Sequence, residues 1–236
     1  AVLEIPYLVN FRFDEGSGTS AAALAPYNAV SGTAVNTTWI DGVDGQPLHA
    51  LSFNGSSSYV GLAANELFAV ADDGTTFAAW VKPSVLSSSY NMILSHGSRH
   101  YLALYNGYVF FSTTTADGVQ HWNNSAITLT PGLWYHLAGS YDREGYMKLF
   151  INGRQSGSTG GPFLSPGFIA DSMTIGKYDG YNLYYFNGVI DDVQFCRRGL
   201  NDKEIRRLKD RAVVAFSFPL DEGTGNTVYD DFDATS

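Results

Sequence analysis

The chain has 236 residues, 44% of them hydrophobic and 14% aromatic, and its 14 basic and 23 acidic residues give a net charge of −9. An acidic surface repels phosphate backbones, so nucleic acid is not an expected partner. No run approaches the roughly 20 apolar residues of a membrane span, which excludes membrane insertion. Because Cys196 is the single cysteine, the chain can form no internal disulfide.

The sequence is a series of short strand patterns separated by turns, with one helical stretch. In chain order the predicted strands are residues 7–13, 48–53, 58–62, 75–82, 90–95, 100–105, 108–113, 134–141, 147–151, 154–156, 172–177 and 188–195. Residues 21–31 are predicted to be loop. Asn106-Gly107 and Asn152-Gly153 are typical two-residue hairpin turns. The pattern predicts an all-β, two-sheet antiparallel sandwich, a jelly roll.

The predicted helix, Leu200–Lys209, follows the last strand of the domain. Asn201 and Glu204 have the spacing of a capping box, and Ile205 and Leu208 share one face. This segment also carries much of the basic charge of an otherwise acidic chain. We expect one short helix near the C-terminal end of the domain.

Two segments near the ends of the chain repeat each other. Residues 11–18 read FRFDEGSG and residues 218–225 read FPLDEGTG, so that Asp14 aligns with Asp221. A repeat of this length is a whole domain rather than a solenoid unit. We therefore predict one domain over residues 1–209, followed over 210–236 by the first strand and turn of a second, truncated repeat. The same tail could be a strand exchanged with another copy or added to a neighbouring subunit.

Several motifs together resemble one family. FRFDEGSG, LSFNGSSSYV, FAAWVKP, LTPGLWYHLAGSYD, MKLFINGR and FNGVIDDVQFCRRGLNDKEI occur in the order and spacing of laminin G-like domains, which belong to the concanavalin A-like lectin/glucanase superfamily. The resemblance covers about residues 7–209. It implies a jelly roll of the kind used as carbohydrate-binding modules, adhesion modules and extracellular scaffold domains. It says less about function, since sites are grafted onto folds.

Carboxylates at the two ends of the domain suggest a cation site. The resemblance implies that the first and last strands pair, which would bring them together, and related jelly rolls often hold a structural calcium near this seam. Calcium takes six to eight oxygens from carboxylates and carbonyls. The candidate calcium ligands are Asp14, Gly16, Asn54, Asp191 and Asp192. The alternative is that Asp14 only caps a turn.

Aromatic residues in polar surroundings suggest a sugar site. Residues 178–186 read YDGYNLYYF, and Trp122 lies in the segment GVQHWNNS, which is predicted to be a polar loop. An aromatic floor with a few polar groups is typical of a small-ligand site. The candidate glycan-binding residues are Trp122, Asn123, Asp179, Tyr181, Asn182 and Tyr184. The alternative is that these tyrosines are ordinary sheet residues.

No catalytic pattern is recognised. The E-x-D-x-x-E strand motif of related glucanases is absent, as is G-x-S-x-G. Asp191 and Asp192 are adjacent on a strand and should face opposite sides, so that they could not flank one bond. Trp80, Trp134, His136 and Cys196 are interpreted as packed structural residues.

These observations predict a non-catalytic, extracellular or cell-surface carbohydrate-binding and adhesion module with a structural calcium. The expected partners are glycans of matrix or cell-surface polysaccharide, with other copies of the same chain as a further possibility. Two alternatives remain open at this point: a structural or assembly module that makes protein–protein contacts through the C-terminal repeat, and an ancillary domain of a glycoside hydrolase.

Overall fold

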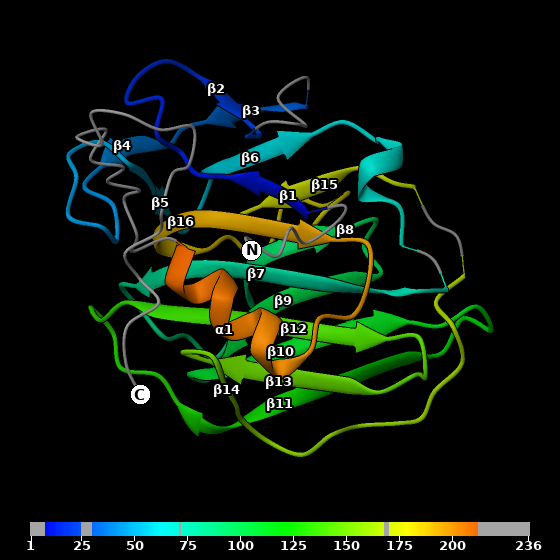
Figure 1. The fold of residues 1–236 in the computed structure, drawn as a ribbon. Coiled ribbons are helices and arrows are strands. Elements are labelled where there is room, and N and C mark those ends of the chain that lie inside the picture. Colours follow the sequence, from blue (N-terminus) through cyan, green and yellow to red (C-terminus); the bar gives the residue numbers. More distant parts are fainter. Residues whose placement is uncertain (1–7, 25–29, 71, 168–169, 212–236) are drawn as a thin grey trace, which may run out of the picture.

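The computed structural model describes residues 8–24, 30–70, 72–167 and 170–211, and the predicted second repeat therefore lies almost wholly outside the described residues. Two eight-stranded antiparallel sheets face each other across one hydrophobic core (Figure 1). The predicted all-β sandwich with a short helix near its C-terminal end is confirmed.

Sheet A has the order β14-β13-β12-β7-β16-β5-β4, with β1 also paired to β16. Its strands are β1 (Leu8–Phe11), β4 (Thr38–Ile40), β5 (Ala50–Asn54), β7 (Gly74–Pro83), β12 (Tyr135–Asp142), β13 (Met147–Ile151), β14 (Arg154–Gln155) and β16 (Asn187–Cys196). The expected pairing of the first and last strands is present, with Phe11 opposite Val193.

Sheet B has the order β11-β10-β9-β8-β15-β6-β3-β2. Its strands are β2 (Ser20–Ala22), β3 (Ser31–Val35), β6 (Tyr59–Leu62), β8 (Asn91–His96), β9 (His100–Tyr105), β10 (Tyr108–Thr114), β11 (Gln120–Thr128) and β15 (Met173–Ile175). A short 3-10 helix, Glu66–Phe68, precedes β7.

Three early strands differ from the sequence prediction. The start of the predicted loop 21–31 belongs to β2, and β3 and β4 were not predicted. Strands β2 and β3 consist mainly of Ala, Gly, Ser and Thr, and β4 has only three residues, so all three leave little apolar alternation to recognise. Trp122, predicted in a loop, lies in strand β11. Polar residues on both sides of Trp122 hid the strand pattern.

Phenylalanines dominate the core between the sheets. The Phe77 ring packs 5.5 Å from that of Phe195 and 6.0 Å from that of Phe111, which comes from the opposite sheet. Gly139 on β12 faces Phe111, where a Cβ atom would lie 2.2 Å from the ring. The close approach of the two sheets at this point therefore requires glycine, as the absence of a side chain allows.

Two histidines lie inside the sandwich at the hairpin between β8 and β9. The rings of His96 and His100 stack 5.9 Å apart. His96 Nε2 accepts a hydrogen bond from the Asp171 N–H, and His100 Nδ1 contacts the Thr113 hydroxyl. Burial lowers the pKa of His96 to about 4 and that of His100 to about 3, so both rings are neutral in the folded protein at pH 7.

Helix α1 (Asp202–Arg211) covers the outer face of sheet A (Figure 1). Asn201 Oδ1 accepts from the N–H groups of Lys203 and Glu204, while Glu204 accepts from the Asn201 N–H, which confirms the predicted capping box. Beneath the helix is a small apolar cluster of Ala78, Ala138, Phe150, Cys196, Leu200, Ile205 and Leu208. Within the described residues, no helix is long and apolar enough to cross a membrane.

A β-bulge in β16 changes the expected position of two carboxylates. Asp191 is paired with Trp80 and Gln194 with Ala78, which leaves Asp192 as the extra residue, with φ +44°. Asp191 and Gln194 therefore both face away from the core, and Asp192 bonds to the Gln194 side chain on that same face. The prediction that Asp191 and Asp192 face opposite sides is wrong, because the bulge interrupts the alternation.

Candidate functional site

The outer face of sheet B carries a row of side chains that runs across four strands. Trp122 on β11 is paired with Ser112 on β10, Ser112 with Tyr101 on β9, and Tyr101 with Ser95 on β8. Paired residues of neighbouring strands lie about 5 Å apart and point to the same side of the sheet. Gln120 lies two residues before Trp122 on β11, so it shares this face.

Five tyrosines form a continuous aromatic surface on this face, which we call the aromatic platform: Tyr90, Tyr101, Tyr178, Tyr181 and Tyr184. The Tyr178 ring stacks on Tyr181 at 5.7 Å and contacts Tyr101 at 6.2 Å. The Tyr90 ring lies 5.7 Å from that of Tyr184. Tyr101 lies on β9 and Tyr90 directly precedes β8, both interior strands of sheet B, whereas the other three rings come from the loop between β15 and β16. The rings of the loop therefore pack against the rings of the sheet.

The tyrosine loop is fixed to the β8–β9 turn by Asp179. This carboxylate is 7% exposed and accepts hydrogen bonds from the Gly97 N–H at 3.0 Å and the Ser172 hydroxyl at 2.9 Å. The Tyr178 hydroxyl donates to the Ser98 carbonyl at 2.9 Å. Asp179 thus holds the platform in place and is turned away from the surface.

The backbone of Tyr184 is held in an unusual conformation. Its φ is +59°, in the left-handed region that glycine prefers. Strain of this kind costs about 1–3 kcal/mol and is often found at functional sites. The Tyr184 carbonyl accepts a hydrogen bond from the Met92 N–H at 2.9 Å, which ties the strained residue to β8.

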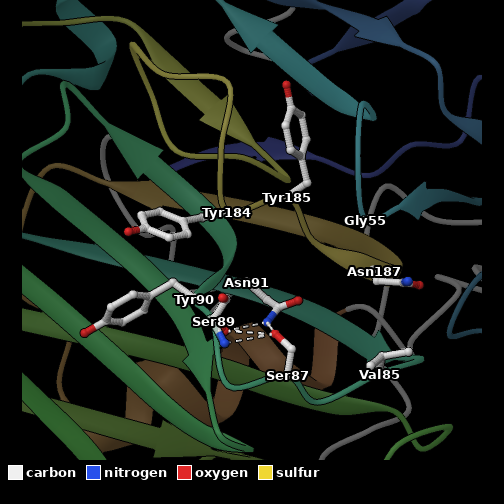
Figure 2. A pocket seen from close by; sticks show the side chains of 9 residues that line it. All are labelled: Gly55, Val85, Ser87, Ser89, Tyr90, Asn91, Tyr184, Tyr185 and Asn187. Atoms are coloured by element: carbon white, nitrogen blue, oxygen red, sulfur yellow. Dashed lines mark hydrogen bonds between the residues drawn. The ribbon is translucent and has the colours of Figure 1, made fainter.

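Two hollows adjoin at the Tyr90–Tyr184 ring pair. The platform hollow, of about 360 Å³, is lined by Tyr90, Met92, Tyr101, Gln120, Tyr178, Tyr181, Leu183 and Tyr184. The amide hollow, of about 280 Å³, is lined by Gly55, Val85, Ser87, Ser89, Tyr90, Asn91, Tyr184, Tyr185 and Asn187 (Figure 2). Among the described residues, no charged side chain lines either hollow, so both are suited to a neutral ligand.

The structure brings some of the predicted glycan-binding residues together and separates others. Trp122, Tyr181 and Tyr184 share the outer face of sheet B and are 63%, 58% and 40% exposed. Asn182 is exposed on the same loop, where its Oδ1 accepts from Lys177 Nζ at 3.3 Å. Asn123 is turned inward and donates to the carbonyl of Ser158, which places it away from this face.

Sequence reasoning missed the part of the platform that the sheet supplies. Tyr90, Tyr101 and Gln120 lie in or beside strands, where their residue types are ordinary. The available signal was the alternation of residues 101–105, which places aromatic residues on the outward positions of β9. The alternation identifies binding residues only when it is known which face of the sheet is left uncovered, and the sequence does not show which face that is.

Three of the candidate calcium ligands, Asp14, Asp191 and Asp192, lie at or beside the seam between β1 and β16. Asp192 Oδ2 accepts from Gln194 Nε2, and Asp191 Oδ2 accepts from the Val43 N–H, each at 2.9 Å. Asp14 lies in the loop after β1, with its carboxylate 3.1 Å from Arg12 Nε and 3.3 Å from His49 Nδ1. Asp44, which the sequence did not single out, is 3.4 Å from the same histidine nitrogen.

Burial makes these carboxylates hard to ionise. It raises the pKa of Asp191 to about 7 and that of Asp192 to about 6, and it also raises the pKa of Asp14. The neighbouring carboxylates of Asp192 and Asp44 raise the pKa of Asp191 further. A nearby divalent cation would oppose both effects.

Two observations bear on whether a cation fits this seam. The buried oxygens Asn10 Oδ1 and Asp192 Oδ1 have no hydrogen-bond partner, and both are of the hard type that calcium prefers. Yet no group of three or more His, Cys, Asp or Glu side chains in the described residues is already placed to hold a metal. The donor types fit calcium, whereas closure of a full site would require side chains such as Asp14 to leave Arg12 and His49.

The remaining two predicted ligands have different positions. Gly16, with φ +70°, adjoins Leu48 beside the Asp14 loop. Asn54 is paired with Asn187 at the start of β16, and its Oδ1 accepts from the N–H groups of Ser56 and Ser57 at 2.9 Å. The structure therefore places Asn54 in a turn, apart from the seam.

Comparison with known proteins agrees with this architecture. Residues 54–206 match the model of a laminin G-type family described as the concanavalin A-like lectin/glucanases superfamily. No curated protein sequence matches the chain. Similarity to solved structures is extensive but involves low sequence identity, so it bears on the fold alone.

Three solved structures illustrate this similarity. The binding domain of Paraclostridial Mosquitocidal Protein 1 is 13% identical with a TM-score of 0.69, the match covering 86% of this chain and 51% of that one. The binding domain of botulinum neurotoxin DC, solved with rat synaptotagmin II, is 12% identical with a TM-score of 0.64. That match covers 86% of this chain and 51% of the toxin domain. Thus this chain spans about half the length of these toxin domains.

Domain 4 of AbnA, an extracellular GH43 arabinanase from Geobacillus stearothermophilus, was solved in complex with arabinotriose. It is 20% identical with a TM-score of 0.65, and the match covers 85% of this chain and 97% of that one. This domain and the present one therefore correspond over almost their whole lengths.

Proposed function

The chain belongs to the concanavalin A-like lectin/glucanases superfamily, and we propose that it is a non-catalytic, extracellular carbohydrate-binding module whose glycan site is the aromatic platform with Trp122. The observation that carries the proposal is the aromatic outer face of sheet B, whose two hollows are lined by uncharged side chains among the described residues. There the platform hollow presents tyrosine rings beside the amide of Gln120. Family relatives and structural neighbours are mostly binding domains, which supports a non-catalytic role.

The chemistry of the face suits sugars. The apolar side of a pyranose or furanose ring packs on an aromatic ring, while its hydroxyls need hydrogen-bond partners at the rim. Tyr181 offers an exposed ring stacked on Tyr178, and Gln120 and the tyrosine hydroxyls lie around it. The absence of charged side chains from both hollows favours a neutral glycan over an acidic one.

The extent of the face favours a polysaccharide chain. From Trp122 on β11 to Tyr101 on β9 the face crosses three strands, or about 10 Å at the usual strand spacing, and the ring of Tyr178 continues it beyond Tyr101. A face of that length accommodates more than one sugar unit. The end-to-end correspondence with an arabinanase domain supports neutral plant-type oligosaccharides as the first ligands to test, and it also keeps the role of ancillary domain in a glycoside hydrolase open.

The proposal is tested by calorimetric titration with neutral arabino-, xylo- and gluco-oligosaccharides, using wild type, Trp122→Ala and Tyr181→Ala. We expect each variant to lose about tenfold or more in affinity, or 1.4 kcal/mol, with unchanged unfolding curves. Tyr146→Ala is the matched control, because Tyr146 is a 38% exposed tyrosine at the turn before β13. Binding that survives both platform variants would refute this site.

The alternative function is an assembly module that contacts other proteins or other copies of itself. It depends on the C-terminal repeat, which lies outside the described residues. Its distinguishing result is an absence of glycan binding together with concentration-dependent polymers in analytical ultracentrifugation. A glycan-binding monomer would contradict it.

We also propose that calcium binds at the β1–β16 seam through Asp191, Asp192 and Asn10, with Asp14 or Asp44 completing the site. The support is the pair of orphaned buried oxygens and the raised pKa values of the carboxylates. At a calcium concentration of 100 times its Kd the fold should gain about 2.7 kcal/mol, or roughly 5–10 °C in Tm. Asp192→Asn should lose that gain. Equal Tm values of the wild type in calcium and in EDTA would refute the site.

A further inference from the structure

The amide hollow lies directly beside the aromatic platform and shares two rings with it. Tyr90 and Tyr184 form its boundary with the platform hollow, and Val85 and Asn187 lie on the opposite side (Figure 2). A ligand that extends across the Tyr90–Tyr184 pair therefore passes from one hollow into the other. None of the residues on the far side was recognised from the sequence as part of a binding site.

Asn91, whose side chain is largely buried, supplies a hydrogen-bond acceptor to this hollow. Its side chain is only 6% exposed, and Nδ2 donates to the Ser87 hydroxyl at 2.8 Å and to the Ser89 carbonyl at 2.9 Å. Both amide hydrogens are thus used to hold the serine turn. Oδ1 has no hydrogen-bond partner in the described part of the chain, and Figure 2 shows it pointing away from the serines toward the side of the hollow where Val85 and Asn187 lie.

The other groups of the hollow add an amide and an apolar wall. No described residue forms a hydrogen bond with the Asn187 side chain, which lies against Gly55. Val85 is 49% exposed at the rim. Rings of Tyr90 and Tyr184 complete the wall, and none of the described residues that line the hollow is charged. A neutral ring with hydroxyls on one side and C–H groups on the other matches this combination.

The size of the hollow limits what it holds. At about 280 Å³ it lies near the lower end of the range for ligand sites, about 300–1,000 Å³. It therefore has room for one sugar unit and not for a chain of several. The rigid serine turn and the fixed Tyr184 backbone mean that this shape exists before a ligand arrives.

We propose that the amide hollow is a second sugar subsite, which takes the unit next to the one stacked on the platform and recognises its hydroxyls through Asn91 Oδ1 and the Asn187 amide. This inference rests on the proposed glycan function. It adds the part of the site that recognises the arrangement of the ligand's hydroxyl groups. The platform supplies tolerant stacking, whereas the amide hollow discriminates between neutral sugars that differ in the placement of one hydroxyl.

The experiment is a length series measured by calorimetry. The neutral arabinose, xylose and glucose series, each from the monosaccharide to the hexasaccharide, are titrated into wild type, Asn187→Ala and Val85→Trp. The tryptophan fills the hollow from its rim and removes no hydrogen bond, and Asn187→Ala removes an amide that has no partner. Asn91 itself is not replaced first, because its loss would also release the serine turn.

For wild type we expect affinity to rise by about tenfold at the length at which the ligand reaches the hollow, which is the effect of one or two added hydrogen bonds. Both variants should lose that step and keep the affinity of the shorter oligosaccharides. Tyr181→Ala should instead lower affinity at every length.

The outcomes separate the two proposals. A step of equal size in wild type and in both variants, or no step in wild type, would overturn the subsite and leave the platform standing. Binding at every length that is insensitive to Tyr181→Ala, or no binding by wild type at any length, would overturn the glycan platform and the subsite together.

Discussion

The two outer faces of the sandwich show how similar strand patterns are put to different uses. On sheet A, the outward residues of paired strands β7 and β12 include Ala78 opposite Ala138, and α1 packs onto them. On sheet B, the paired strands β9 and β10 place Ala103 opposite Phe110, with tyrosines around them. The first face is closed by a helix of the same domain, while the second ends in exposed rings.

The difference lies in the chemistry of the outward side chains. Small residues let a helix come close, and Ile205 and Leu208 then bury fully against the sheet. Tyrosines keep a hydroxyl for water and an apolar ring for a partner, so they are stable at a surface that is only sometimes covered. Exposed aromatic rings gather on the outer face of sheet B, which is the face on which the proposed glycan site lies.

The largest expected effect tests this contrast directly. Ile205→Ala, on the covered face, should destabilise the fold by about 2–5 kcal/mol, since it leaves a cavity beneath α1. Tyr181→Ala, on the open face, should change stability by less than about 1 kcal/mol. Urea unfolding of both variants measures the difference. Similar losses for the two substitutions would mean that Tyr181 is a packing residue.

The next effect concerns the anchor of the tyrosine loop. Asp179→Ala leaves the Gly97 N–H and the Ser172 hydroxyl without their acceptor, so we expect a loss of about 1–3 kcal/mol in stability together with weaker glycan binding. Asn182→Ala, on the exposed part of the same loop, is the control and should leave stability unchanged. If Asp179→Ala weakened binding with no effect on unfolding, Asp179 would be a sugar ligand after all.

The sequence predicted the sandwich and the capped helix because both have local signatures, such as alternation, Asn-Gly turns and the spacing of Asn201 and Glu204. It predicted the tyrosine loop for the same reason. It could not predict the bulge at Asp192, which depends on pairing with β7. Nor could it show that Asn123 and Asp179 turn inward, because their hydrogen bonds are made to distant segments of the chain. The hydrogen bonds from Asn91 Nδ2 to the serine turn likewise depend on the folded shape of that turn.

A third effect concerns the histidines behind the open sheet. His96 and His100 have folded pKa values of about 4 and 3, below the ordinary value of 6.5. Between about pH 4 and 6.5 these two rings therefore bind more protons in the unfolded chain than in the folded one, so they contribute a rise in stability with pH through that window. The raised pKa values of Asp191 and Asp192 contribute in the opposite direction, so the contribution of His96 is taken from the difference between variant and wild type. Each proton contributes at most about 1.4 kcal/mol per pH unit.

His96→Gln keeps an acceptor for the Asp171 N–H and removes the titrating group. The slope of the unfolding free energy against pH should therefore change by up to the contribution of one proton, about 1.4 kcal/mol per pH unit. Other charged groups facing the pair are Asp171 and Arg99, and they remain in place. Urea unfolding in EDTA from pH 4 to 7.5 measures the slope. His121→Gln serves as the control, because the His121 ring stacks on Phe163 and lies away from the buried pair. An unchanged slope in His96→Gln would show that His96 does not titrate on unfolding.

The last prediction is measured as a labelling rate and reports on how tightly α1 covers sheet A. Cys196 is fully buried beneath α1, and burial raises its pKa to about 11, so very little thiolate is present at pH 8. Alkylation by iodoacetamide should therefore be slow and should require opening of the helix. If Ile205→Ala makes opening easier by about 2 kcal/mol, labelling should accelerate about thirtyfold. Tyr181→Ala should leave the rate unchanged, because nothing on the open face holds the helix. Fast labelling of the wild type would mean that the face of sheet A is not closed in solution, and the contrast between the two faces would then be lost.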